Sequence, residues 1–134
     1  MSADVNIKVI EGVYDAFARG DVGAILAVVT DDVDWASEAV STVAPWYGPH
    51  RGKDGVADFF TALSSAMEVE EFTPNVFAAT DTHVLTVVGF RVKARATGRT
   101  AAMDLHHCFE LRDGKIARYR GTEDTAQTEA VLRR

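Results

Sequence analysis

Apolar and polar residues alternate from Ala101 to Leu111, which is typical of a β-strand with one buried face. One face carries four apolar residues and one histidine: Met103, Leu105, His107, Phe109 and Leu111. The opposite face carries the other residues of the run: Asp104, His106, Cys108 and Glu110. His107 is therefore a titratable group among apolar neighbours, and we interpret it as a pointer to a functional site.

Asp113-Gly114 indicates a tight hairpin turn directly after this strand, because a two-residue loop needs positive φ angles. A partner strand from about Lys115 to Glu123 should follow the turn. The same alternation predicts three further strands, at about 33–38, 71–79 and 83–96. Thr97-Gly98 is the predicted turn before the strand that begins near Thr100.

Apolar residues three and four positions apart predict helices in the first half of the chain. The apolar stripe of the first helix, about residues 4–19, consists of Ile10, Val13, Tyr14 and Phe17. Gly20 should end this helix, and Asp21 should cap a second one from Val22 to about Val29. Residues 39–51 contain three breakers, Pro45, Gly48 and Pro49, and are predicted to form a loop.

A third helix is predicted to begin at Gly52-Lys53-Asp54-Gly55, with Val56, Phe59, Phe60 and Leu63 on its buried side. Asp124 and Gln127 fit a capping box for a short last helix that ends near Leu132. Helices that are separate from a run of antiparallel strands indicate an α+β fold. The length of 134 residues fits one domain covering 1–134.

Composition excludes several classes of protein. The formal net charge of −6 argues against general nucleic-acid binding. No run of 18 apolar residues is present, so no membrane span is expected, and the first residues do not resemble a signal peptide. A single cysteine, Cys108, leaves no disulfide framework and no cysteine metal cluster. We therefore expect a cytoplasmic protein that does not bind nucleic acid or membranes.

No cofactor or metal site is expected from the motifs. The chain contains neither GxGxxG nor GxxxxGK[ST], the patterns that cradle dinucleotides and nucleotide phosphates. His106 and His107 are adjacent on a strand, so their side chains point to opposite faces and make a poor pair of metal ligands. Cys108 also faces away from His107, which disfavours a Cys-His nucleophile pair.

Four short motifs occur in an order that resembles a known family. They are Tyr14-Asp-Ala-Phe-Ala-Arg-Gly-Asp21, Asp31-Asp32-Val-Asp-Trp35, Arg51-Gly-Lys-Asp-Gly-Val-Ala-Asp-Phe-Phe60 and His107-Cys-Phe-Glu-Leu-Arg-Asp-Gly-Lys-Ile116. Together they resemble the SnoaL-like branch of the nuclear-transport-factor-two-like superfamily, which includes the ketosteroid isomerases. The resemblance implies a cone-shaped, curved antiparallel β-sheet wrapped around three N-terminal helices, with a pocket inside the cone that His107 faces.

The resemblance also assigns positions to residues of this chain. Aligned on Gly20-Asp21, the tyrosine of ketosteroid isomerases falls on Val13, their base on Ser37 and their acid on His107. The SnoaL-like cyclases place a histidine at the position of His107 and a carboxylate near Gly121. Neither the isomerase base position, Ser37, nor the cyclase position, Gly121, carries a carboxylate here. Glu123 is a candidate substitute for the cyclase carboxylate because it shares a face with Gly121.

We consider three residues as catalytic candidates, each with a structural alternative. His107 could act as a general acid/base or as a group that polarises a carbonyl, or it could be a buried, hydrogen-bonded histidine. Tyr14, next to the family position, could line the pocket or only pack in the core. Glu123 could be a displaced base or a simple carboxylate at the sheet edge.

The expected walls of the pocket are apolar and aromatic. The candidates for substrate binding are Trp35, Trp46, Phe60, Met103 and Tyr119. Trp46 and Tyr47 lie in the predicted loop, at a pocket mouth or a subunit contact, and His50 could reach a ligand or remain a solvated loop residue.

Two functions are consistent with these features. The first is a cofactor-free isomerase or cyclase that removes a proton next to a carbonyl group of a small hydrophobic molecule. The alternative is a binding or interaction module of the same fold without turnover, which the residues at Ser37 and Gly121 favour. The family resemblance also predicts a homodimer that pairs through the sheet, either by the outer-face residues Val84, Thr86 and Val88 or by the alternate face of the same strand.

Overall fold

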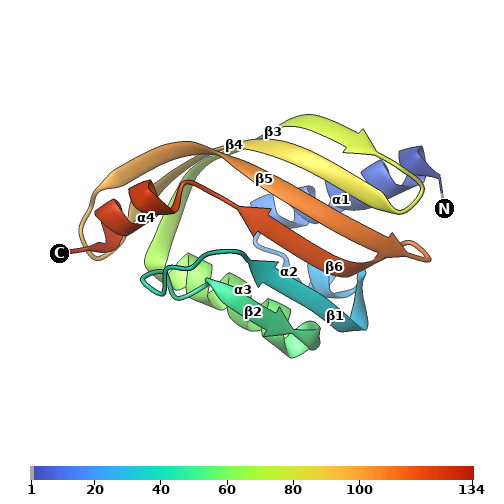
Figure 1. Cartoon of the computed structure of the whole chain (residues 1–134), viewed down its shortest axis with the longest axis horizontal. Coiled ribbons are helices and arrows are strands. Elements are labelled where there is room, and N and C mark those ends of the chain that lie inside the picture. The colour runs from blue at the N-terminus through green and yellow to red at the C-terminus, as the bar shows by residue number, and fades with distance from the viewer. Residues whose placement is uncertain (1) are drawn as a thin grey trace.

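The computed structural model describes residues 2–134 and has the predicted α+β architecture (Figure 1). The helices in these residues are α1 (Ala3–Ala18), α2 (Val22–Leu26), α3 (Gly52–Ala66) and α4 (Thr125–Leu132). The strands are β1 (Val29–Ser37), β2 (Gly48–Arg51), β3 (Met67–Ala79), β4 (His83–Ala94), β5 (Thr100–Arg112) and β6 (Lys115–Thr122). All the predicted helices and strands are therefore present.

The strands form one curved sheet in the order β2-β1-β6-β5-β4-β3. The long strands β3, β4 and β5 arch over the first three helices, and α4 lies at one end of the sheet (Figure 1). On the concave side α1 packs against β3 and β4, and α3 packs against β1 and β2. The predicted cone is confirmed, and its core is the space between the sheet and these helices.

One strand pair differs from the predicted antiparallel sheet. β1 runs parallel to β6, with Trp35 opposite Tyr119 and Ser37 opposite Gly121. The difference follows from the connections, because β1 and β6 are not joined by a hairpin and lie far apart in the sequence. This pair brings the aromatic residues of an early strand beside those of the last strand, which matters for the site described below.

Two predicted boundaries were wrong in the N-terminal third. The second helix ends at Leu26, and β1 already begins at Val29, before Asp31-Asp32. Both aspartates are exposed, so they lie in the strand without disturbing its buried positions. The predicted loop 39–51 also contains the short edge strand β2, in which His50 pairs with Trp35.

The predicted turn at Asp113-Gly114 and the predicted helix caps at Asp21 and Asp124 are confirmed. Asp113 and Gly114 have φ angles of 53° and 78° in the β5–β6 hairpin, as a two-residue turn requires. The side chain of Asp21 accepts a hydrogen bond from the backbone N–H of Ala24 at the start of α2. Asp124 likewise accepts from the backbone N–H of Gln127 at the start of α4.

The outer face of the sheet carries two exposed apolar side chains. Val76 on β3 is 51% exposed and Leu85 on β4 is 52% exposed. The alternate residues of β4, Val84, Thr86 and Val88, were expected on the outer face, and this was wrong, because all three are buried on the inner face. The predicted homodimer stays a prediction, and of the two faces of β4 considered for it, the Leu85 face is the exposed one. No helix in residues 2–134 is long and apolar enough to cross a membrane.

Candidate functional site

A cavity of about 70 Å³ lies between the concave face of the sheet and the helices. Aromatic and aliphatic side chains from α1, α3 and the strands make up most of its wall. Among residues 2–134, neither lysine nor arginine lines it, and its one carboxylate is Glu123. The remaining polar groups come from tyrosine, tryptophan, serine, threonine and histidine side chains, so a ligand meets an apolar surface with a few hydrogen-bonding atoms.

Three side chains form a hydrogen-bonded chain, which we call the imidazole cluster: Thr86, Tyr14 and His107. The hydroxyl oxygen of Tyr14 lies 2.6 Å from Oγ1 of Thr86 and 2.7 Å from Nδ1 of His107. Tyr14 comes from the apolar stripe of α1, and the other two come from paired positions of β4 and β5. The cluster therefore joins the first helix to the middle of the sheet.

The imidazole cluster is uncharged at neutral pH. Burial, with a smaller contribution from the neighbouring His106, lowers the pKa of His107 from 6.5 to about 3. Burial also raises the pKa of Tyr14, and the hydrogen bond with Thr86 opposes this rise only in part. A neutral imidazole and a neutral phenol are the result, because desolvation disfavours the charged form of both groups.

The hydrogen bond to Nδ1 determines what His107 can offer a ligand. If Tyr14 donates to Nδ1, then Nε2 carries the proton and is a donor; if Nδ1 donates, Nε2 is an acceptor. Thr86 is compatible with both directions, because a hydroxyl donates and accepts. In the described chain Nε2 of His107 has no hydrogen-bond partner, so this atom is the one available to a bound molecule.

Trp35 and Tyr119 lie face to face in the wall of the cavity. Their ring centroids are 4.1 Å apart and the planes are inclined by 27°. This stack results from the parallel β1–β6 pairing, which places the two residues opposite each other. The indole N–H of Trp35 is fully enclosed and has no hydrogen-bond partner in the described chain.

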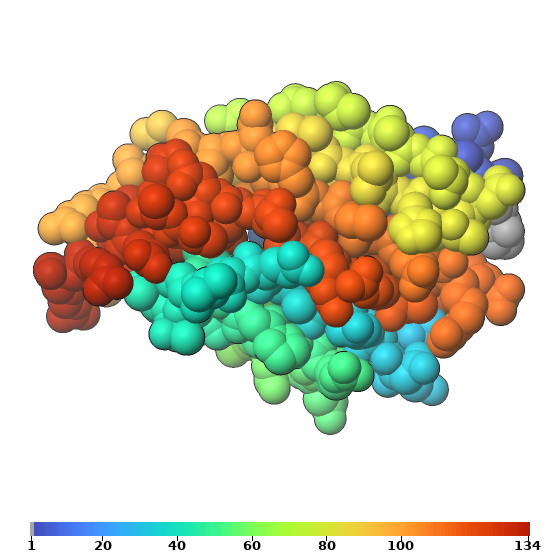
Figure 2. Space-filling model, in the orientation of Figure 1, coloured from blue at the N-terminus to red at the C-terminus, as the bar shows by residue number. Residues whose placement is uncertain are grey.

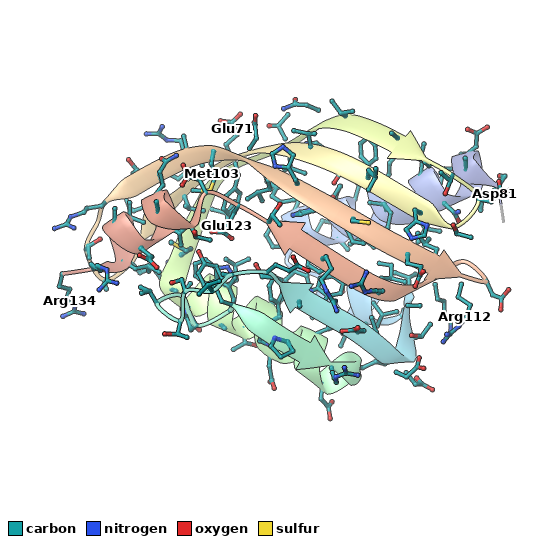
Figure 3. The ribbon with its side chains drawn as sticks, in the orientation of Figure 1. Glu71, Asp81, Met103, Arg112, Glu123 and Arg134 are labelled. Carbon is teal, nitrogen blue, oxygen red and sulfur yellow. The ribbon has the colours of Figure 1, made fainter. Side chains whose placement is uncertain are left out.

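A second group of polar side chains, the carboxylate cluster, surrounds Glu123. Its oxygens accept hydrogen bonds from Nε1 of Trp46 at 3.4 Å, from the hydroxyl of Tyr47 at 3.1 Å and from the hydroxyl of Thr128. Glu123 lies between the end of β6 and the start of α4 (Figure 3). The cluster thus ties the 38–47 segment to the last helix, and these two parts of the chain meet in Figure 2, in cyan and red.

The structure brings seven of the eight predicted site residues to one cavity. Tyr14, Trp35, Trp46, Phe60, His107, Tyr119 and Glu123 all line it. Met103 does not; it is partly buried against the core, on the part of β5 that lies nearer α4 (Figure 3). His50 is not a lining residue either, and its Nε2 atom pairs with the backbone oxygen of Trp46 at 2.9 Å.

Sequence reasoning missed one polar residue in each of the imidazole and carboxylate clusters, Thr86 and Thr128 respectively. Thr86 is the more informative of the two. It is buried and bonded to Tyr14, whereas the sequence reasoning expected it on the outer face of the sheet. The available signal was its position between Val84 and Val88, which makes it a single hydroxyl in an apolar stripe. A polar side chain in such a stripe has to find a buried partner.

A family model described as a SnoaL-like domain matches residues 10–119, which includes most of the elements that build the cavity. The chain belongs to the SnoaL-like domain family. The match confirms the resemblance drawn from the four motifs. No curated protein matches the sequence of this SnoaL-like domain.

Solved structures share the fold of this SnoaL-like domain along its whole length. An NTF2-like protein of unknown function from Burkholderia pseudomallei is 24% identical, with a TM-score of 0.90 and 100% of both chains covered. An NTF2-like protein from Burkholderia xenovorans is 26% identical, with a TM-score of 0.89 and 99% of both chains covered. TerC, co-crystallised with polyporic acid, is 24% identical, with a TM-score of 0.83, and the match covers 96% of this chain and 98% of TerC.

Proposed function

We propose that this SnoaL-like domain binds a small, mostly apolar molecule with a carbonyl group and promotes its enolisation without a cofactor. The observation that carries the proposal is the Tyr14–His107 hydrogen bond in the wall of an otherwise apolar cavity. It holds the imidazole in place and leaves Nε2 of His107 available to the carbonyl oxygen. The overall reaction would be an isomerisation or a ring closure next to that carbonyl.

Enolisation needs one group that stabilises charge on the carbonyl oxygen and another that accepts a proton from the neighbouring carbon. A neutral imidazole N–H supplies the first, since a hydrogen bond in an apolar site stabilises a developing enolate oxygen. Glu123 is the carboxylate of the cavity lining and supplies the second. The C–H bond breaks and its proton passes to Glu123. In an isomerisation the proton returns to another carbon of the ligand. In a ring closure the enolate carbon bonds to a second carbonyl carbon of the ligand, the π bond of that carbonyl breaks, and its oxygen takes the proton from Glu123.

Cavity volume limits the size of the ligand. The cavity of about 70 Å³ is roughly half the volume of about 150 Å³ that encloses benzene in an engineered protein. The pocket is not fully enclosed, so a molecule of the size of benzene or larger either extends out of it or displaces a lining side chain such as Trp46. Support for ligand binding in this fold comes from TerC, which was crystallised with polyporic acid.

Exchange of ketone α-protons for deuterium tests the proposal without knowledge of the natural substrate. NMR would follow acetone, cyclopentanone and 1-tetralone, three ketones of increasing size, in D₂O with and without protein. We expect faster exchange for the smaller ketones, complete loss in His107→Ala, and a large loss in Glu123→Gln. His106→Ala is the matched control, because it removes the adjacent histidine from the exposed face of the same strand.

One observation favours the alternative of a binding module without turnover. Glu123 already accepts three hydrogen bonds within the protein, which reduces its capacity to accept a proton from a ligand. The same experiment separates the two functions. Ketones that bind, as seen by shifts of the His107 ring signals, but do not exchange faster than in buffer would reject enolisation and support the binding module.

A further inference from the structure

Gly121 lies opposite His107 on the neighbouring strand, and another residue takes the space of its missing side chain. A Cβ atom on Gly121 would lie 2.1 Å from the hydroxyl oxygen of Tyr119 and 2.8 Å from Cζ of the same ring. It would also lie 3.4 Å from Cδ2 of His107. Residues two apart on a strand share a face. The hydroxyl of Tyr119 therefore occupies the space beside His107 that a side chain at position 121 would fill. We call this space the seat.

The ring of Tyr119 is held in this seat by its neighbours. It stacks on Trp35 on one side, and its centroid lies 5.3 Å from that of His107 in an edge-to-face arrangement. Phe109 packs against it at a centroid distance of 5.1 Å. Because Tyr119 is only 5% exposed and these contacts surround it, its hydroxyl is positioned before any ligand arrives.

The Tyr119 hydroxyl differs from the other two tyrosine hydroxyls in having no partner. Tyr14 is bonded to His107 and Thr86, and Tyr47 is bonded to Glu123. In residues 2–134 no hydrogen bond involves the hydroxyl of Tyr119, and the hydrogen bond from Arg120 goes to its backbone oxygen. The hydroxyl oxygen is nevertheless not fully enclosed, unlike the unpaired Nε1 of Trp35. The hydroxyl is therefore open to the cavity that Tyr119 lines, and a buried polar group in this state calls for a ligand or water.

The charges around the seat define the kind of partner. Burial raises the pKa of Tyr119, and the nearby Tyr14 and Glu123 raise it further, so the phenol is neutral and can donate. His107 is neutral as well. In the part of the chain that the structure describes, neither lysine nor arginine lines the cavity, while the carboxylate of Glu123 does. An anionic ligand would meet no positive charge and one negative charge, whereas a carbonyl oxygen needs only donors.

We propose that Tyr119, seated over Gly121, donates a hydrogen bond to the ligand's carbonyl oxygen beside His107, and that the site thereby selects uncharged carbonyl compounds over carboxylates. The inference rests on the ligand binding in the proposed function but not on its proton transfer. Tyr119 thus becomes a specificity-determining residue rather than only part of the wall. Gly121 is the positioning residue that makes the seat possible.

Binding of three probes of similar shape tests this role. The probes are cyclopentanone labelled with ¹³C at the carbonyl, methylenecyclopentane, which lacks the oxygen, and cyclopentanecarboxylate, which is charged. Wild-type protein should bind the ketone more tightly than the carboxylate, and the ¹³C signal should move downfield on binding. Tyr119→Phe keeps the ring and should weaken ketone binding by about 2- to 12-fold, the range for one neutral hydrogen bond, with a smaller ¹³C shift.

The hydrocarbon probe shows whether Tyr119 donates a hydrogen bond to the ligand or only packs against it. Its affinity should be unchanged in Tyr119→Phe, because the ring and its stacking on Trp35 remain. Gly121→Ala, checked for folding by circular dichroism, should displace the hydroxyl and also weaken the ketone selectively. An equal change for ketone and hydrocarbon, an unchanged ¹³C shift in Tyr119→Phe, or no ketone binding by wild-type protein would overturn the inference. Selective ketone binding without deuterium exchange would reject enolisation alone and leave this role of Tyr119 in place.

Discussion

The imidazole cluster and the carboxylate cluster each contribute residues to the wall of the same cavity but use their hydrogen bonds differently. In the first, three neutral groups share two hydrogen bonds, and Nε2 of His107 has no partner in the described chain. In the second, one carboxylate accepts from three donors that belong to two distant segments. The first arrangement leaves capacity for a ligand, whereas the second holds the chain together. Polar residues around one cavity can therefore either keep a hydrogen-bonding atom unpaired or join distant segments of the chain.

Acidification should disrupt the imidazole cluster, and this is the largest effect we expect. The pKa of His107 falls from 6.5 to about 3 on folding, so between these values the unfolded chain binds a proton that the folded protein excludes. The free energy of unfolding should therefore decrease as the pH falls from about 6.5 towards 3, by at most about 1.4 kcal/mol per pH unit from this group. Urea denaturation at a series of pH values measures it. His107→Gln should flatten the dependence, and an equal slope in both proteins would contradict the assignment.

Removal of the Tyr14 hydroxyl should have the next largest effect. Tyr14→Phe keeps the ring but deprives Thr86 and His107 of their shared partner. A loss of about 1–3 kcal/mol in the free energy of unfolding is expected, because buried polar atoms remain unpaired. The ¹⁵N signals of the His107 ring should also change as Nδ1 loses its hydrogen bond. Unchanged stability together with unchanged ring signals would show that the cluster does not form in solution.

Neutralising Glu123 should weaken the carboxylate cluster without changing its shape. Glu123→Gln leaves one acceptor oxygen for three donors, and we expect a loss of about 1–2 kcal/mol in the free energy of unfolding. The fluorescence of Trp46 should change at the same time. Glu129→Gln on α4 is the matched control, because Glu129 forms only a surface ion pair with Arg133. Equal losses in both variants would contradict the holding role of Glu123.

Tyr47→Phe should give the smallest loss in the free energy of unfolding, and it is the counterpart of Tyr14→Phe in the carboxylate cluster. Glu123 keeps Trp46 and Thr128 as donors after this change, so only one hydrogen bond of 3.1 Å is lost. The expected loss is about 0.5–1.5 kcal/mol, measured by urea denaturation at neutral pH. A loss that exceeds the one in Tyr14→Phe would reverse the order and indicate that the carboxylate cluster is the more tightly coupled of the two.

Alternation along a strand predicted the face of each residue but not its place along the cavity. His107 and Met103 were both assigned to the inner face, yet only His107 lines the cavity. They are four residues apart, which corresponds to roughly 13 Å along an extended strand. The alternation of a strand shows which face a residue occupies but not how far along the strand the cavity extends. It therefore predicted the orientation of His107 correctly and still assigned Met103 to the cavity wall.

Contacts between distant segments could not be read from local patterns. The Tyr14–Thr86 bond joins residues 72 positions apart, and the Trp46–Glu123 bond joins residues 77 positions apart. Gly121 appeared in the sequence only as a missing carboxylate, because nothing local shows that the Tyr119 hydroxyl fills its space. The helix caps and the Asp113-Gly114 turn were predictable, since each depends on residues within a few positions of one another.

The parallel pairing of β1 with β6 has a consequence for biosynthesis. Trp35 leaves the ribosome early, but its neighbour Tyr119 follows 84 residues later, as their numbers in the register show. Until then β1 lacks one of its two partners, and the aromatic wall of the cavity cannot assemble. Pairings of such long sequence separation fold slowly and leave apolar strands exposed meanwhile. The nascent chain thus carries an unfinished cavity until its last strand, β6, has been synthesised.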